Sequence, residues 1–265
     1  MSSETLRLAI IHDAFPSSSD DARLGQSLAE AVADGATLAA LPELPVDPWY
    51  PEHRERSNQE SEAPGGKREA RMAQAARAAN IGLLGGLIVK QDGRLHNRAL
   101  LFDSQGQILS RYDKLHLPSE PGYYESDHYE PGDALSEPSD QFNIPLGIQL
   151  CSDLQRPTAC CALVAMGAEL ILHPRATPAS SYPRWQTVLR ATAITNACWV
   201  VSINRPGGAP SIAIDPFGEV IVETTERLTT VDIERDRVAA ARLEYPGYLA
   251  SPAALYAKSW GDLAP

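Results

Sequence analysis

The stretch of residues 146–174, LGIQLCSDLQRPTACCALVAMGAELILHP, restricts the fold more than any other part of the chain. Residues 146–150 form a short apolar run after a proline, as expected of a buried strand. Residues 159–168 then carry apolar side chains at helical spacing, a few positions after a proline suited to a first helical turn. Residues 169–173 return to strand character. The stretch therefore predicts an α/β arrangement in which Cys151 lies at the turn from a strand into a helix.

Two interpretations of Cys151 follow from this position. A thiol has an unperturbed pKa of about 8.5, and backbone N–H groups at a helix start or a nearby cation would raise the thiolate fraction that a nucleophile needs. A free cysteine can equally be a small buried apolar residue. The stretch by itself leaves both interpretations open.

The composition favours one ordinary enzyme-sized domain. A chain of 265 residues is long enough for a single domain over 1–265 that buries roughly 70–75% of its unfolded surface. The formal net charge of -11 argues against a nucleic-acid partner, which would require basic clusters. Charged residues interrupt the apolar runs near the start, so we expect no signal peptide or membrane span and a cytoplasmic location.

The cysteines indicate free thiols. No CxxC pair and no histidines at zinc spacing accompany them, so we expect no disulfide, no metal and no cofactor in a reducing compartment. Two of them lie in the helix expected after Cys151 and are interpreted as packing residues. A third begins an apolar strand. The four are Cys151, Cys160, Cys161 and Cys198.

Outside the central stretch, strands and helices alternate irregularly. We expect further strands at 6–14, 37–44, 81–90, 95–103, 108–113, 198–204, 211–215, 220–224 and 228–233. We expect helices at 21–35, 67–80, 182–197 and 234–243. Several strands follow one another directly, so this is not a simple strand–helix alternation. Two sheets between helix layers fit the order better.

Two long irregular segments and a tail complete the chain. Residues 45–64 and 119–139 are rich in proline and charge, and long ordered loops in compact domains are often functional. Their aromatic side chains either wall a binding pocket or pack as ordinary loop residues. The tail, 244–265, carries four aromatics and suits packing on a second subunit. The candidate pocket residues of the two segments are Trp49, Tyr50, Tyr124 and His128.

Three polar residues share a position at the end of an expected strand. Glu43, Lys114 and Cys151 each terminate one, and sites in α/β sheets assemble at the carboxyl ends of strands. A thiol, an ammonium and a carboxylate brought together supply a nucleophile, an electrostatic stabiliser and a general base. The trio predicts acyl transfer without histidine or metal.

The same residues lie in segments that resemble the nitrilase superfamily of carbon-nitrogen hydrolases. The resemblance covers nearly the whole chain, in the order of the family, and it implies a four-layer αββα sandwich and a homodimer or higher homo-oligomer. The segments are LPEL (41–44), NRALLFDSQGQILSRYDKLHLP (97–118), YYES (123–126), PGD (131–133), GIQLCSD (147–153), GAELILHP (167–174), VVSINR (200–205) and SIAIDPFGEV (211–220).

The resemblance also implies roles for the site residues. Glu43 would be the general base, Lys114 would stabilise the oxyanion, and Cys151 would form a thioester. The Ser152 N–H would lie beside the developing negative charge, and Glu125 would orient Lys114 and the substrate. The implied substrate is a small amide or N-carbamoyl compound. A nitrile substrate, acyl transfer to an amine and a catalytically idle scaffold remain alternatives.

The chain departs from the family close to the nucleophile. The run CSDLQRPTACC has Ser152 and Thr158 where many members have an aromatic residue and a proline-glutamate pair. The substrate of this chain therefore cannot be inferred from that of a well-known branch of the family. Arg175, just past a strand end, is a candidate ligand for a substrate carboxylate, because a guanidinium binds a carboxylate bidentately. A solvated or internally paired arginine is the alternative.

Overall fold

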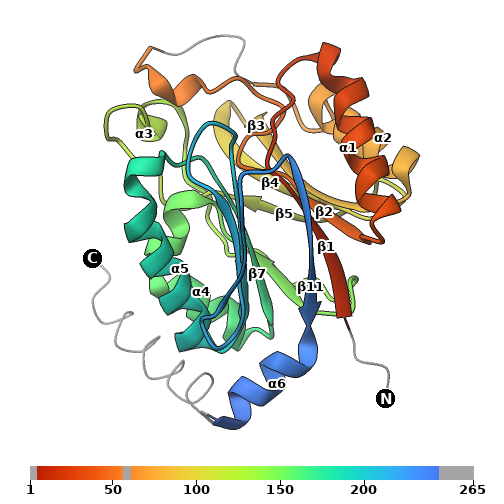
Figure 1. The fold of residues 1–265 in the computed structure, drawn as a ribbon. Coiled ribbons are helices and arrows are strands. Elements are labelled where there is room, and N and C mark those ends of the chain that lie inside the picture. Colours follow the sequence, from red (N-terminus) through yellow and green to blue (C-terminus); the bar gives the residue numbers. More distant parts are fainter. Residues whose placement is uncertain (1–4, 56–60, 245–265) are drawn as a thin grey trace.

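The structure is a computed structural model that describes residues 5–55 and 61–244. Two sheets form its centre (Figure 1). The first has the strand order β11-β1-β2-β3-β4-β5 and the second β10-β9-β8-β7-β6. The strands of the first sheet are β1 (Thr5–Ile11), β2 (Leu38–Ala40), β3 (Gly82–Gln91), β4 (Arg94–Phe102), β5 (Ile108–Asp113) and β11 (Leu228–Glu234). Those of the second are β6 (Leu146–Ile148), β7 (Leu170–Arg175), β8 (Trp199–Asn204), β9 (Ser211–Ile214) and β10 (Val220–Thr224).

Inner strands such as β1 are largely buried on both faces because each sheet is covered on both faces, whereas the edge strand β10 is partly exposed. In β1, Leu8 and Ile10 point into the core between the sheets, whereas Ala9 and Ile11 point to the helices outside. This is the period of two that a strand imposes on its side chains. The core between the sheets draws on both of them, with Leu172 among the members from the second sheet.

Helices cover the two outer faces. α1 (Asp21–Ala33) and α2 (Lys67–Ala79) pack on the first sheet. α4 (Pro157–Ala165) and α5 (Tyr182–Asn196) pack on the second. The expected four-layer αββα sandwich is thus confirmed. The remaining helices are α3 (Glu125–His128) and α6 (Arg235–Glu244), with short 3-10 turns at η1 (Ser18–Asp20), η2 (Tyr50–Glu52), η3 (Cys151–Gln155) and η4 (Ala179–Ser181).

Two expected strands are shorter than their apolar runs. The strand expected at 37–44 ends at Ala40, and the one expected at 146–150 ends at Ile148. Both runs continue as buried loop, and each leads into a left-handed residue, Leu44 at φ 48° and Cys151 at φ 43°. The residues after each strand are buried although they pair with no neighbouring strand, so the apolar pattern extends beyond the strand and overestimates its length.

The cysteines are all free. Cys160 and Cys198 are buried, but Cys161 is exposed, so the expected packing role is wrong for Cys161. Neighbouring positions of a helix point about 100° apart, so the two cysteines of α4 cannot both face the sheet. The aromatic tail expected to pack on a partner subunit lies at 245–265, outside the described residues. No helix within residues 5–55 and 61–244 has the length and apolar character needed to span a bilayer.

Candidate active site

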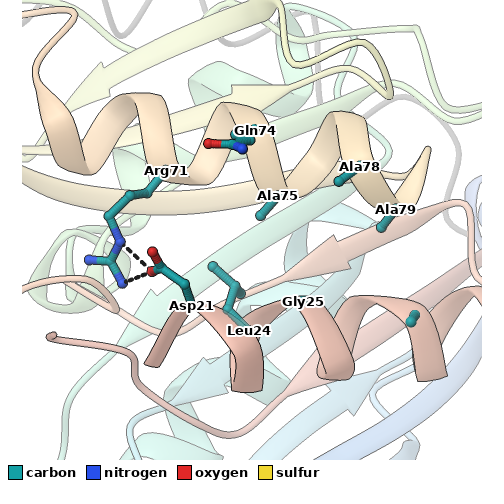
Figure 2. A pocket seen from close by; sticks show the side chains of 9 residues that line it. Asp21, Leu24, Gly25, Arg71, Gln74, Ala75, Ala78 and Ala79 are labelled. Carbon is teal, nitrogen blue, oxygen red and sulfur yellow. Dashed lines mark hydrogen bonds and ion pairs between the residues drawn. The ribbon is translucent and has the colours of Figure 1, made fainter. Parts of the chain in front are cut away.

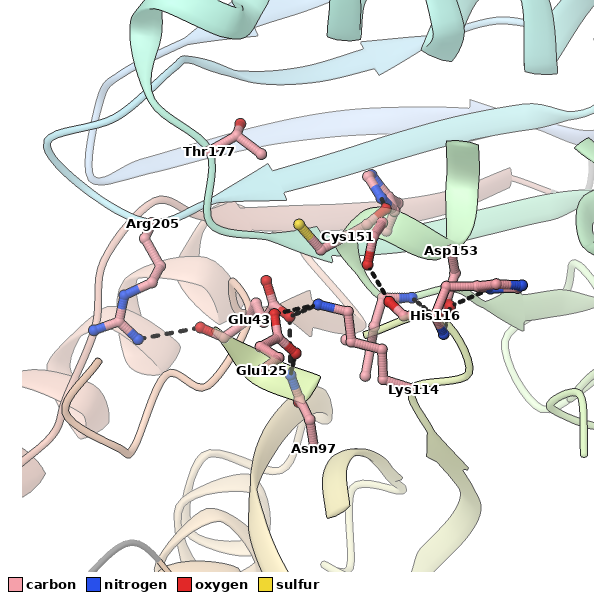
Figure 3. A network of polar contacts seen from close by, with 12 residues as sticks. Glu43, Asn97, Lys114, His116, Glu125, Cys151, Asp153, Thr177 and Arg205 are labelled. Atoms are coloured by element: carbon pink, nitrogen blue, oxygen red, sulfur yellow. Dashed lines mark hydrogen bonds and ion pairs between the residues drawn. The ribbon is translucent and has the colours of Figure 1, made fainter. Parts of the chain in front are cut away.

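Four polar side chains from separate parts of the chain meet where strand ends of the two sheets face each other (Figure 3). Glu43 follows β2, Lys114 follows β5, and Cys151 begins η3 just after β6. Glu125 is the first residue of α3. All four are buried, with 0 to 5% of their surface exposed. The three expected strand ends therefore do converge.

Lys114 is held by two carboxylates. Its Nζ donates to Glu43 Oε1 at 2.8 Å and to Glu125 Oε1 at 2.6 Å. Asn97 Nδ2 donates to the same two carboxylates, at 2.9 Å to Glu43 and 3.2 Å to Glu125. Burial acts to lower the pKa of Lys114, but Glu125 and Glu43 outweigh it and raise that pKa well above its usual value. The ammonium is therefore permanently charged.

Two carboxylates share this one ammonium, and the pKa of Glu125 is altered as a result. Burial raises the pKa of Glu125 to about 7; Lys114 opposes this rise and Glu43 adds to it. Glu43 Oε2 is buried and accepts no hydrogen bond from the described residues. A buried carboxylate oxygen without a donor is a free proton acceptor.

Cys151 stands in a backbone conformation that few residues adopt. Its φ of 43° costs a non-glycine residue about 1–2 kcal/mol. Figure 3 shows Cys151 next to the Glu43–Lys114 cluster. Burial and the Glu43 charge raise the pKa of the thiol, whereas Lys114 and the Ala176 N–H lower it. The resting group is thus a neutral thiol, and the raised thiolate fraction expected from a nearby cation is not present in the free site.

Asp153 joins the cysteine turn to the lysine segment. Oδ2 accepts from Tyr112 Oη at 2.7 Å and from the Leu150 N–H at 3.2 Å. Oδ1 accepts from the His116 N–H at 2.8 Å and lies 2.9 Å from His116 Nδ1. Asp153 thereby binds residues on both sides of Lys114 and the residue before Cys151.

Arg205 binds the backbone of the loop that carries Glu43. Arg205 Nη1 donates to the carbonyls of Glu43 at 3.1 Å and Leu44 at 2.5 Å. Leu44 is one of the left-handed residues. The guanidinium also lies 5.8 Å from the ring centre of Trp49. Arg205 therefore holds a strained turn next to the Glu43 carboxylate.

Cys151 opens on a cavity of about 580 Å³. Tyr123, Ser152 and Trp185 are among its walls, and Arg184 is the cation that lines it. A smaller cavity of about 240 Å³ shares Tyr123 with it and adds Trp49 and Arg205. The combined size suits a small molecule.

The expected pocket residues divide into two groups. Ser152 lines the cavity of Cys151 and Trp49 lines the adjoining one. Tyr50, Tyr124 and His128 line neither. Tyr124 stacks under Arg54, with the guanidinium carbon 4.3 Å from its ring centre, and buried His128 contacts the His53 carbonyl. The contacts of Tyr124 and His128 favour ordinary loop packing.

Arg175 is fully buried and lines neither cavity. Its guanidinium donates to Ser202 Oγ at 2.7 Å, to Thr177 Oγ1 and to the Pro210 carbonyl. The donors expected to bind a substrate carboxylate are thus used inside the protein, which disfavours that contact.

Four residues that shape the site had no individual signal in the sequence. Asn97 and Asp153 lie within quoted motifs, but their contacts depend on segments far away in the chain. His173 donates from Nε2 to the Cys151 carbonyl at 2.8 Å, and Tyr123 lines both cavities. Asn97 had the best chance of prediction, since it lies on the strand that pairs with the one leading to Lys114.

A further cavity of about 290 Å³ lies between α1 and α2 (Figure 2). Its walls are mainly small side chains, with Asp21 and Arg71 joined at one end by an ion pair of 2.6 Å. The one charged pair is already satisfied and no cysteine or histidine lines this cavity. This cavity therefore offers no nucleophile or general base of the kind found beside Cys151.

Comparison with known proteins agrees with the fold. The family described as carbon-nitrogen hydrolase matches residues 20–243, and the chain belongs to this family. It is a carbon-nitrogen hydrolase of the nitrilase superfamily, as its motifs predicted. Human omega-amidase NIT2 is 27% identical over 96% of this chain and 97% of its own length.

Solved structures share the fold. A carbon-nitrogen hydrolase from Helicobacter pylori G27 superposes with a TM-score of 0.80 at 22% identity, covering 91% of this chain and 94% of its own. An amidase from Nesterenkonia sp. gives a TM-score of 0.75 at 24% identity, covering 92% of this chain and 95% of its own. The αββα architecture is therefore common to the three proteins.

Proposed function

We propose that the chain hydrolyses a small-molecule amide through a thioester on Cys151, with Glu43 as general base, Lys114 as electrostatic stabiliser and Glu125 as the residue that orients Lys114. One observation carries the proposal: a buried ammonium is bonded to two buried carboxylates beside a thiol on the wall of a small-molecule cavity. Buried titratable groups with perturbed pKa values and specific charged partners beside a cavity are typical of functional sites.

The first half-reaction begins from the neutral thiol. As the sulfur attacks the amide carbon, its proton passes to the free Oε2 of Glu43. Negative charge then develops on the carbonyl oxygen, where Lys114 and the Ser152 N–H stabilise it. Glu43 returns the proton to the departing nitrogen, so ammonia or an amine leaves and a thioester forms.

The second half-reaction restores the enzyme. Glu43, again a carboxylate, takes a proton from water, and the resulting hydroxide attacks the thioester carbon. Lys114 stabilises the second oxyanion, and the thiolate leaves with the proton that Glu43 holds. Throughout, Glu125 and Asn97 keep the ammonium in place.

The amide class is supported by similarity to human omega-amidase NIT2 and by the size of the cavity. An N-carbamoyl compound reacts by the same steps. A nitrile would react at the same sulfur, but the attack would first give a planar thioimidate. Addition of one water would then give a tetrahedral species, and loss of ammonia from it would leave the same thioester.

The test is ammonia release from a panel of small amides, N-carbamoyl compounds and nitriles, with Cys151→Ala and Glu43→Gln as paired variants. We expect hydrolysis of at least one amide, none by either variant, and a thioester adduct by mass spectrometry in the parent protein alone. Added hydroxylamine would reveal acyl transfer as a hydroxamate. Full hydrolysis by Cys151→Ala contradicts the proposal.

A further inference from the structure

The buried guanidinium of Arg175 has no acidic partner. None of its surface is exposed, and its three hydrogen-bond acceptors are Ser202, Thr177 and the Pro210 carbonyl. Among residues 5–55 and 61–244, no carboxylate lies within ion-pair distance of it. Arg98, by contrast, binds Asp113 at 2.7 Å. A buried charge is normally paired with an opposite one, because burial without a partner is costly.

The missing opposite charge can form at Cys151. Arg175 ends β7 and Cys151 follows β6, and these two parallel strands are neighbours in one sheet. Burial lowers the pKa of Arg175 to about 10, and an anionic Cys151 acts against that decrease. Ala176, which follows Arg175 in the chain, lines the same cavity as Cys151, so the end of β7 lies beside the cysteine turn.

Counting the charges around the sulfur shows what Arg175 adds. Glu43 and Glu125 face Lys114, which alone cannot neutralise both carboxylates. An anion at Cys151 would add a further negative charge to that side. Arg175, at the end of the neighbouring strand β7, gives the site a second buried cation. The other titratable groups facing Cys151 or Arg175 are Tyr123, His173, Tyr182 and His12.

A chain of hydrogen bonds also links Arg175 to the cysteine backbone. Arg175 Nε–H donates to Ser202 Oγ at 2.7 Å. The Ser202 hydroxyl keeps its own proton and donates it to His173 Nδ1 at 2.8 Å. His173 Nε2 then donates to the Cys151 carbonyl at 2.8 Å. Burial lowers the pKa of His173 to about 3, so the ring is neutral and this arrangement of protons is fixed.

We propose that Arg175 is a positioning residue of the active site: a second buried cation that stabilises negative charge at Cys151 and, through Ser202 and His173, fixes the turn that presents the sulfur. This inference builds on the proposed role of Cys151 as nucleophile. It assigns Arg175 to the enzyme's own charge balance and not to the substrate.

The test is the rate of Cys151 alkylation by iodoacetamide between pH 6 and 9, in a Cys161→Ser background because Cys161 is the exposed cysteine. Arg175→Met removes the charge and keeps an unbranched stem. Arg175→Lys keeps the charge without the planar fork, and Ser202→Ala breaks the relay while retaining the guanidinium. Unfolding temperatures are measured for all variants, and Arg175→Gln replaces Arg175→Met should the latter not fold.

Below the thiol pKa the alkylation rate follows the thiolate fraction, so one pKa unit of lost stabilisation lowers the rate about tenfold. We expect a loss of this size at every pH for Arg175→Met and recovery of most of the rate in Arg175→Lys. An unchanged rate in a folded Arg175→Met, or equal losses in the Met and Lys variants, overturns the proposal. An inactive Cys151→Ala together with an unchanged Arg175→Met would defeat this inference alone, whereas an active Cys151→Ala defeats the proposed function.

Discussion

Asp153 holds His116 twice, through the backbone N–H at 2.8 Å and at ring Nδ1 at 2.9 Å. Since Tyr112 binds the other oxygen of the same carboxylate, the residues two before and two after Lys114 share one acceptor. That acceptor lies two residues after Cys151. The spacing between ammonium and sulfur is therefore set by a carboxylate that contacts neither.

Asp153→Asn should reduce kcat more than it raises KM. The amide keeps the shape but places an N–H₂ group against donors, and a misplacement on the order of 1 Å in an active site costs about 10²-fold in rate. Steady-state kinetics on the best amide measure this effect. Tyr112→Phe is the matched control: it removes a single hydrogen bond, worth about 1.5–3 kcal/mol when the acceptor is charged. Equal kinetics in Asp153→Asn and the parent protein would contradict the expectation.

Lys114→Met should destabilise the fold as well as abolish turnover. It leaves Glu43 and Glu125 buried without a cation, and breaking a buried pair in this way costs about 3–5 kcal/mol. Urea unfolding measures the loss, and adding Glu125→Gln to the same variant should restore part of it. Lys114→Arg keeps the charge, but we expect no activity because a planar fork cannot occupy the place of a compact ammonium.

The stability of the protein should depend on pH through Glu125. Its folded pKa of about 7 lies above the usual glutamate value of 4.5, so the folded state binds this proton more tightly than the unfolded state does. The resulting stabilisation is complete below the unfolded pKa and is lost as the pH rises through about 7. Between about pH 5 and 8, the free energy of unfolding should therefore fall more in the parent protein than in Glu125→Gln. Parallel curves for the two proteins would show that Glu125 does not titrate in this range.

Arg205→Ala should release the loop that positions Glu43. The substitution removes the donor shared by the carbonyls of Glu43 and Leu44, and the strained Leu44 turn then loses what holds it. We expect kcat to fall about tenfold or more, with alkylation of Cys151 unchanged because the sulfur does not depend on this contact. Arg205→Lys retains one donor and should keep more of the activity than Arg205→Ala.

The sequence predicted the layers and the convergence of Glu43, Lys114 and Cys151, because alternation, strand order and motifs report on them directly. It could not predict the resting state of the thiol. A cation near Cys151 suggested an ionised sulfur, but burial and Glu43 outweigh Lys114. The balance of these three effects depends on depth in the fold, which no local pattern records.

The fate of Arg175 shows a second limit. Its position past a strand end was compatible with both a substrate contact and internal pairing. Internal pairing follows from its hydrogen bonds to Ser202, Thr177 and Pro210. Ser202 and Pro210 are 27 and 35 positions away in the chain. Asn97 escaped notice for the same reason, since its two carboxylate partners are separated from it by 54 and 28 positions.

The left-handed backbone at Cys151 has an evolutionary implication. Glycine adopts that conformation without steric penalty, so Cys151→Gly would relieve torsional tension that Cys151→Ala retains. A descendant released from selection for turnover would remove this tension by replacing the cysteine side chain with a hydrogen atom. Glycine at this position in a related sequence would thus indicate a lineage that has lost its catalytic activity.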